Sequence, residues 1–349
     1  NQTKVSLVST PAYPIKAFIE TMCSYGVDAT NGHLKCSYFL KDVPGQQDTI
    51  ANNGAFTQRH NFISRSANVE MCDTLHTELN TLNKLLPPGL DIQFMFYLNN
   101  PNFYLQRKVN VVAQGADANA VPAANDIYEI QFTDFYLSYD RVALEPSLAS
   151  SIESRLNRNE KAIFPITRSV IKTRNVPAQQ MDFLWQNLYS GQLPETIILG
   201  ILDSDTYNGN LNKNYFNFKH HRLNSVQLRV NSQAMPSMPL KQNFMTAKAY
   251  RTFRHFMDNI GIDNSNTPCL INYEDFVAGC TLIPFDLTPT KSATIYNHDK
   301  KTGNVEVDMK FTVPLPNGIT VFAMCIYDDK FLIQGPRMNR EVILNPNLI

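Results

Sequence analysis

The sequence predicts an all-β protein that contains two tandem β-sandwiches and a few short helices. Three observations lead to this fold class. Segments that alternate like half-buried strands recur along the chain, turn-forming residues separate them, and one order of elements occurs twice. The 349 residues are enough for two domains of ordinary size, each with a core of its own.

Strand patterns occur in both halves of the chain. Residues 127–136 alternate with period two over their whole length, which is typical of a half-buried strand. Residues 91–98 alternate at first and then become apolar. Many of the remaining segments carry β-branched or aromatic residues on one face, and further strands are expected at 163–172, 196–202, 225–230, 305–313 and 319–327.

Asparagine–glycine pairs and 20 prolines separate these segments. An Asn-Gly pair tolerates the positive φ that a tight hairpin needs. The pairs stand at 31–32, 53–54, 208–209 and 317–318. We therefore expect residues 305–313 and 319–327 to form a hairpin through 314–318.

Three segments carry apolar residues at helical spacing. Residues 15–24 and 247–260 each place aromatic and aliphatic side chains on one face. In residues 147–159, Leu148, Ile152 and Leu156 recur every four positions. This last helix follows the strand pattern of 127–142, so we interpret it as a linker between two domains.

A weak internal repeat supports two copies of one sandwich. In the first half, a strand pattern at 5–8 precedes a proline-rich turn and the helix at 15–24. In the second half, a strand pattern at 226–230 precedes the proline-rich turn 235–239 and the helix near 247–260. The expected domains are residues 1–145, a linker at 146–162 and residues 163–349.

The composition favours a protein that packs against copies of itself. Lys plus Arg and Asp plus Glu are both 31, so the formal net charge is zero, and only 18% of the residues are charged. A neutral polar surface loses less solvation energy than a charged one when it is buried in an assembly. Zero net charge gives no global attraction to nucleic acid. The sequence contains no run of 18 apolar residues, the length that a membrane span requires. The six cysteines are expected to be free thiols.

Sequence patterns of catalysis and of metal binding are absent, so we expect no enzyme, no cofactor and no metal. His220, His221 and Arg222 are basic, but a solvated or interface face explains them better than a phosphate site. Residues 203–209 resemble part of a calcium loop with the wrong spacing, and a polar turn is the better interpretation. The single Trp185 is expected to anchor a core.

An ordered set of segments resembles a known family. Phe164 to Arg168, Gly191 to Pro194, Tyr207 to Gly209 and Asn214 to His220 look like the capsid proteins of Polinton (Maverick) elements and adintoviruses. The order continues through Pro236, Pro239 and Phe285 to Pro289, and Tyr13 to Met22 resembles the family's aromatic helix. Lys213 to Tyr215 departs from the expected run. The motif residues are Pro165, Thr167, Arg168, Gly191, Leu193, Pro194, Gly209, Asn214, Phe216, Phe218, Pro236, Pro239, Phe285, Asp286, Thr288 and Pro289.

The resemblance implies two jelly rolls side by side, in other words a double jelly roll. It implies a major capsid protein whose homotrimers form pseudo-hexameric, hexon-like capsomers of an icosahedral virion. Its partners would be neighbouring capsomers and minor capsid proteins, after assembly in the nucleus or cytoplasm of the host cell. Contact with packaged DNA would be weak, through basic spots such as Lys219 to Arg222 or Lys300 and Lys301.

Two motif regions also have a physical interpretation of their own. Phe216 and Phe218 are expected to share one strand face and to anchor the second core. Pro284 and Pro289 bracket the end of a strand, because proline cannot donate to a β-ladder. Asp286 or Thr288 can then satisfy the loose backbone donors of the turn.

Three other functions compete with the major capsid protein. A penton-like vertex protein usually needs one jelly roll, a ligand-binding β-sandwich would show exposed aromatic loops, and a cupin-like enzyme would need clustered histidines. The repeat adds one further expectation. Only about a dozen residues precede the first helix, so several strands of the first jelly roll should lie upstream of Asn1 or come from another chain.

Overall fold

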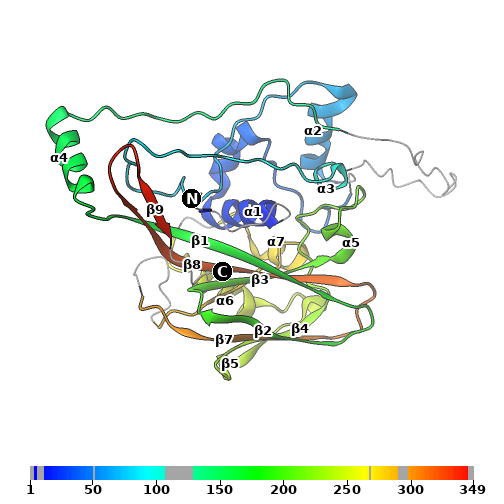
Figure 1. The fold of residues 1–349 in the computed structure, drawn as a ribbon. Helices are drawn as coiled ribbons and strands as arrows, with labels where there is room; N and C mark the ends of the chain where they lie inside the picture. The colour runs from blue at the N-terminus through cyan, green and yellow to red at the C-terminus, as the bar shows by residue number, and fades with distance from the viewer. Residues whose placement is uncertain are drawn as a thin grey trace.

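The computed structural model describes residues 4–5, 12–49, 52–106, 129–266, 269–289 and 298–344. Its strands form two antiparallel sheets that lie one above the other in Figure 1, and its helices are short. The predicted all-β class is therefore confirmed. Among the described residues all of the strands belong to 162–344, which includes most of the predicted second domain.

The central strands of the first sheet are buried on both faces. Its strand order is β1 (Ala162–Val176), β8 (Ile319–Gln334), β3 (Thr196–Asp203) and β6 (Ile283–Asp286), and β9 (Glu341–Leu344) pairs with β8. Residues 197–203 of β3 and 319–325 of β8 are all buried. A strand that is covered on both faces reads as a continuous apolar run instead of an alternation, which explains the pattern at both segments.

The second sheet has one buried face and one exposed face. Its strand order is β2 (Asp182–Gln192), β7 (Thr302–Phe311), β4 (Leu223–Val230) and β5 (Gln233–Lys241). The alternate residues Val305, Val307 and Met309 of β7 are fully buried and face the first sheet. Trp185 on β2 is buried in the same core, as predicted.

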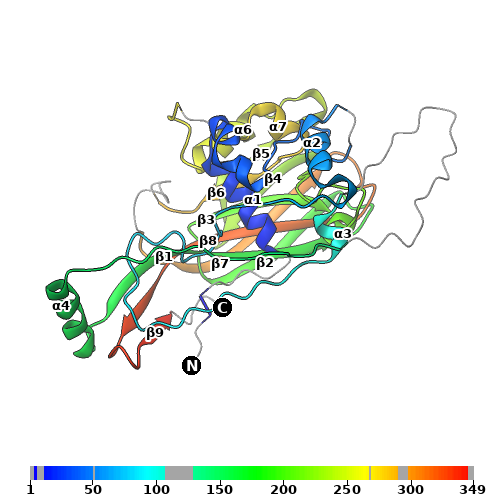
Figure 2. The ribbon, with the colours of Figure 1, turned by 90° about the horizontal axis from the view of Figure 1, so that it is seen from above.

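Helix α1 (Tyr13–Ser24) covers the outer face of the first sheet. Figures 1 and 2 show it lying across the strands on the side opposite the second sheet. Its buried Ile15, Ile19 and Met22 belong to the same apolar cluster as the sandwich. The backbone N–H of Leu270 donates to the carbonyl of Met22 at 3.0 Å, which ties the end of α1 to the sandwich domain.

The remaining helices are short, and two of them match predictions. The predicted helix at 247–260 is α6 (Tyr250–Asn259), and the predicted helix at 147–159 is α4 (Pro146–Asn157). Proline stands in the first turn of α4, where its absent N–H costs nothing. The others are α2 (Gly54–Ile63), α3 (Pro101–Tyr104), α5 (Ser204–Tyr207), α7 (Tyr273–Ala278) and the 3₁₀ helices η2 (Val27–Asn31), η3 (His33–Ser37), η4 (Ser64–Ser66) and η5 (Phe244–Thr246).

An arm of β1, β8 and β9 extends beyond the sandwich toward α4 (Figure 1). A small separate core of Phe164, Ile166, Phe331 and Ile333 stabilises the arm, and leucines of residues 79–90 pack against it. Arg340, between β8 and β9, donates to both carboxylate oxygens of Glu153 on α4 at 2.6 Å. Both bonds come from Nη2 of the guanidinium, and this charge-assisted contact holds α4 against the arm.

Two predictions about the second half are wrong. The segments at 305–313 and 319–327 do form β7 and β8, but these strands belong to different sheets, so residues 312–318 cross between sheets instead of closing a hairpin. The proline-rich segment 235–239 is not a turn but part of β5. It is an edge strand, where proline's absent N–H faces no partner. The turn lies at Asn231 and Ser232, both at positive φ.

The described part of the first half contains helices and irregular chain. The described residues before Ala162 form no strand, so the strands predicted at 91–98 and 127–136 are not formed there; residues 127–128 lie outside the described ranges, as does most of the strand predicted at 5–8. An alternating pattern shows that a segment is suited to a sheet, but a strand also needs a neighbouring backbone to pair with. A first jelly roll at 1–145 stays a prediction.

Candidate functional site

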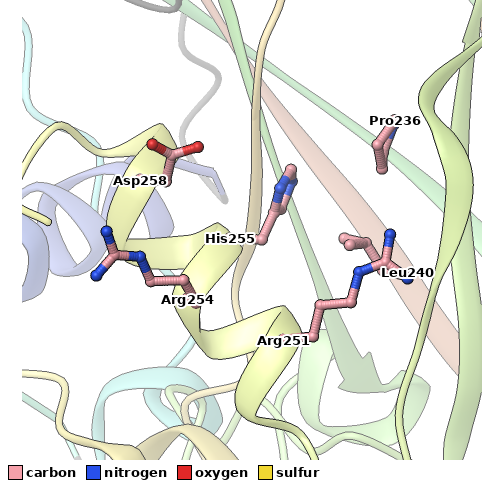
Figure 3. Close-up of a pocket in the computed structure, with 6 residues that line it drawn as sticks. All are labelled: Pro236, Leu240, Arg251, Arg254, His255 and Asp258. Carbon is pink, nitrogen blue, oxygen red and sulfur yellow. The ribbon is translucent and has the colours of Figure 1, made fainter.

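A shallow hollow of about 280 Å³ lies between the edge strand β5 and helix α6. Its lining residues are Pro236, Leu240, Arg251, Arg254, His255 and Asp258 (Figure 3). Figure 3 shows Arg251 reaching toward β5, while Arg254 and Asp258 point away from that strand.

Both arginines of this hollow already have partners. Arg251 donates to the carbonyls of Pro239 and Met238 at 3.3 and 3.5 Å, and Arg254 pairs with Asp263 at 2.9 Å. The six lining residues include His255 and Asp258 but no serine, threonine, cysteine or lysine. Across the described residues, no group of three His, Cys, Asp or Glu side chains is placed to hold a metal ion.

A network of ion pairs joins the N-terminal segment to the sandwich. We call it the Asp203 clasp, and it centres on Asp203 at the end of β3. Asp203 accepts from Lys213 at 2.9 Å and from Lys219 at 3.0 Å, and His221 Nε2 lies 3.2 Å from its second oxygen. Lys219 also pairs with Asp48 at 2.9 Å, which connects the two halves of the chain.

Amides extend the clasp to a second acid in the N-terminal segment. Asn214 donates its backbone N–H to Asp48 at 2.8 Å and its side-chain amide to Asp42 at 3.0 Å. Asn217 donates to Asp48 at 2.9 Å, and Arg59 on α2 pairs with Asp42. These contacts place Asp42, Asp48 and α2 against the loop that follows α5.

The electrostatics of the clasp favour its ionised form. Burial alone raises the pKa of Asp203, but Lys213, Lys219 and His221 outweigh burial and hold that pKa below its usual range. Burial lowers the pKa of Lys219, but Asp48 and Asp203 outweigh it, so the pKa of Lys219 is raised. Asp203, Lys213 and Lys219 are therefore charged groups that stabilise one another at neutral pH, whereas burial lowers the pKa of His221.

The structure brings together one group of the predicted motif residues. Phe216 stacks on Phe18 of α1 at 4.4 Å between ring centroids, and Phe218 is fully buried between Phe18 and Phe322. Asn214 belongs to the clasp, and Gly209 adopts a φ of +98° at the end of α5, a conformation that favours glycine. Residues 214–218 do not form the predicted strand. Their contacts are instead with Asp48 and with α1.

A second group surrounds the end of β6. Phe285 and Asp286 are buried, and Asp286 accepts from the backbone N–H of Thr288 at 2.8 Å and from its hydroxyl at 2.6 Å. This is the predicted role of the turn after the strand. Pro194 is buried near the start of β3, Leu193 is half-buried, and Gly191 and Pro289 are exposed.

The third group lies on strands that carry an edge or an arm. Arg168 of β1 is buried and donates to Asp329 of β8 at 2.9 Å. Pro165 and Thr167 on the same strand are exposed, and Pro236 and Pro239 lie half-buried on β5. The motif residues therefore do not converge on one pocket. Most are placed where chain segments meet.

The predicted DNA-contacting residues are largely occupied by other contacts. Lys219 belongs to the clasp, and His220 stacks on Phe244 at 4.3 Å. Burial, helped by the charges of His221 and Arg222, lowers the pKa of His220 to about 4, so it is neutral at pH 7. Arg222 is exposed, and Lys300 lies 3.5 Å from Asp329.

Two apolar segments lie open to solvent, and we call residues 91–98 and 129–144 the aromatic segments. The second runs along the top of Figure 1 to α4. No backbone hydrogen bond joins either segment to the rest of the described chain. Phe96 and Phe135 touch edge to face at 5.1 Å. The exposed apolar side chains are Ile92, Met95, Phe96, Tyr97, Leu98, Ile130, Phe132, Phe135, Tyr136, Leu137, Tyr139, Val142 and Leu144.

Sequence reasoning found the aromatic segments as patterns but did not predict their exposure, and it missed the clasp. The acids Asp48 and Asp42 lie 166 and 172 positions before their partner Asn214, so no local spacing signals the contact. Within the part of the chain that is described, no helix combines the length and the apolar character that crossing a membrane requires. The six cysteines are free, with Cys36 and Cys72 exposed.

Comparisons with known proteins give distant similarity. No family model matches the chain. An uncharacterized protein of Caenorhabditis elegans, F54H12.2, is 21% identical over 311 residues, which are 88% of this chain and 69% of the relative.

Three solved structures have a similar chain. The PBCV-1 virus capsid has a TM-score of 0.37 at 9% identity over 58% of this chain and 55% of that chain. The Sputnik virophage structure has 0.33 at 11% identity over 54% and 39%. The STIV MCP has 0.23 at 12% identity over 48% and 41%. The chain thus spans about half, or less, of these chains' lengths.

Proposed function

We propose that this chain is a structural subunit of an icosahedral capsid and, more specifically, a major capsid protein of the Polinton or adintovirus type. One observation carries the proposal: the aromatic segments expose thirteen large apolar side chains on chain that has no backbone partner among the described residues. A protein that acts alone rarely leaves so much apolar surface open. A subunit that is completed by its neighbours can do so.

The aromatic segments have the properties of strands that await a sheet. Residues 129–136 keep the alternation of a half-buried strand, and unpaired backbone N–H and C=O groups can accept added strands. We propose that strands outside the described residues, or strands of another chain, complete them as the first jelly roll. The Asp203 clasp and α1 would hold this region against the second sandwich.

The remaining features of the proposal concern assembly. Three subunits would form a hexon-like, pseudo-hexameric capsomer, which contacts neighbouring capsomers and minor capsid proteins in the virion. Arg222 and Lys301, both exposed, would make the weak contacts with packaged DNA. The proposal assigns the subunit a structural role and no catalytic one.

Two alternatives remain. A penton-like vertex protein would form pentamers, and a ligand-binding sandwich would be a monomer that binds through the aromatic segments. Negative-stain microscopy with mass measurement in solution separates all three. Trimers support the major capsid protein. Pentamers, or monomers at high concentration, contradict it.

Matched variants test the carrying observation. Phe135→Ser and Tyr136→Ser together remove two exposed rings from the second aromatic segment; Tyr136 is 76% exposed. Met338→Ser is the control, because Met338 is fully exposed in the loop between β8 and β9. We expect the double variant to shift the mass distribution toward monomer and the control to leave it unchanged. Equal assembly of the parent protein, the double variant and the control would contradict the proposed role of the aromatic segments in assembly.

A further inference from the structure

Two exposed cysteines in the N-terminal half have neighbouring backbones. Cys36 lies in η3 and Cys72 in the irregular chain after η4, and both are exposed. The backbone N–H of Cys72 donates to the carbonyl of Cys36 at 3.0 Å. Standard bond lengths then limit the separation of the two Cα atoms to less than about 7 Å. Disulfides usually span Cα separations of about 4.4–6.8 Å.

The other four cysteines are placed differently. Cys269, Cys280 and Cys325 are buried, and Cys23 is partly covered. Burial raises the pKa of the Cys325 thiol, and that of Cys280, to about 12, and it raises the pKa of Cys23 further still. Since the thiolate is the form that reacts with disulfides, these four thiols are protected. The exposed pair is thus distinguished by access as well as by proximity.

We propose that Cys36 and Cys72 form an intrachain disulfide when the protein meets a small disulfide oxidant such as oxidised glutathione. One thiol loses its proton, and its sulfur attacks the oxidant, breaking the oxidant's S–S bond and releasing one reduced glutathione. The second thiolate then attacks the mixed disulfide and releases a second reduced glutathione. The protein loses two protons and two electrons, and one glutathione disulfide becomes two thiols.

The bond would restrain the segment that carries the acids of the clasp. The closed loop spans residues 37–71, which include Asp42, Asp48 and helix α2. A cross-link limits the conformations of such a loop when its contacts open. The disulfide would persist outside the reducing interior of a cell. There it would favour the contacts that hold Asp42, Asp48 and α2 against the sandwich. The inference rests on the two cysteines and not on the proposed capsid role.

The test is a thiol count and a peptide map of the native full chain. The protein is incubated with oxidised glutathione, blocked with an alkylating reagent, unfolded and digested with trypsin without reductant. Cleavage after Lys35, Lys41, Arg65 and Lys84 releases the peptides 36–41 and 66–84. We expect these peptides to be linked within one chain, and the free thiols to fall from six to four.

Single variants show whether each sulfur resolves the other. In Cys36→Ser and in Cys72→Ser, the remaining exposed thiol should stop at the mixed disulfide with glutathione. Six thiols remaining in the parent protein, glutathione retained on both cysteines, or the two peptides linked only between chains in a covalent dimer would each overturn the proposal. Reduction that restores six thiols to the linked protein is also expected.

Discussion

Loss of Asp329 should leave the buried charge of Arg168 without its counter-ion. The Asp329 side chain has no exposed surface, and that of Arg168 is 2% exposed, with 2.9 Å between Arg168 Nη1 and the carboxylate. Replacing Asp329 with alanine leaves the guanidinium buried without its counter-ion. Breaking a buried pair in this way costs about 3–5 kcal/mol of the free energy of unfolding. Lys300, which is 43% exposed, also pairs with Asp329, but the loss of that pair adds little, because exposed pairs contribute about 0–1 kcal/mol.

The measurement is the free energy of unfolding from denaturant titrations of three variants. We expect Asp329→Ala to lose about 3–5 kcal/mol, because one partner remains charged. The double variant Arg168→Met with Asp329→Leu should lose much less, since it removes both charges and keeps apolar volume. Lys300→Met is the control and should cost less than about 1 kcal/mol. A loss below about 1 kcal/mol in Asp329→Ala, or equal losses in the single and double variants, would refute this reasoning.

Three more predictions concern stability. Phe218→Ala empties a fully buried site beside Phe18 and should cost about 3–5 kcal/mol by denaturant titration, whereas an unchanged midpoint would show that the aromatic contact is dispensable. Asp203, whose pKa is lowered in the folded protein, should contribute stability that is present above about pH 4 and lost as pH falls further, and Asp203→Asn should flatten that acid dependence. Burial and the neighbouring Asp328 raise the pKa of Glu195 from 4.5 to about 7. The contribution of Glu195 to the free energy of unfolding should therefore fall as pH rises from 4.5 to 7. Glu195→Gln should remove that part of the pH profile, and an unaltered profile would contradict the assignment.

The second half of the fold was largely predictable from local patterns. The segments expected at 163–172, 196–202, 225–230, 305–313 and 319–327 overlap β1, β3, β4, β7 and β8. Alternation and apolar runs report whether one or both faces of a strand are covered, and this information is local. The pairing of strands is not local. Residues 314–318 look like a hairpin turn, but the strands on either side of them, β7 and β8, lie in different sheets. Each strand pairs where its apolar face can be buried in the core.

The candidate site was predicted only in part. Asp286 and Thr288 form their turn within three residues, so sequence proximity was enough. Asn214 stood out only through family resemblance, and its partners Asp42 and Asp48 carry no local signal. Ion pairs between such distant residues follow from how two segments pack, and one sequence does not encode that packing in a readable pattern.

By itself the sequence determined the all-β class, the strands β1, β3, β4, β7 and β8 of the sandwich, the helices at 15–24, 147–159 and 247–260, and a composition with little charge. These depend on the periodicity and volume of neighbouring side chains, which are properties of short segments. Only the tertiary structure decided that α1 covers the first sheet, that Cys36 and Cys72 are neighbours, and that the aromatic segments stay open. Each of these depends on which distant backbone is close enough to bury an apolar face or to accept a hydrogen bond.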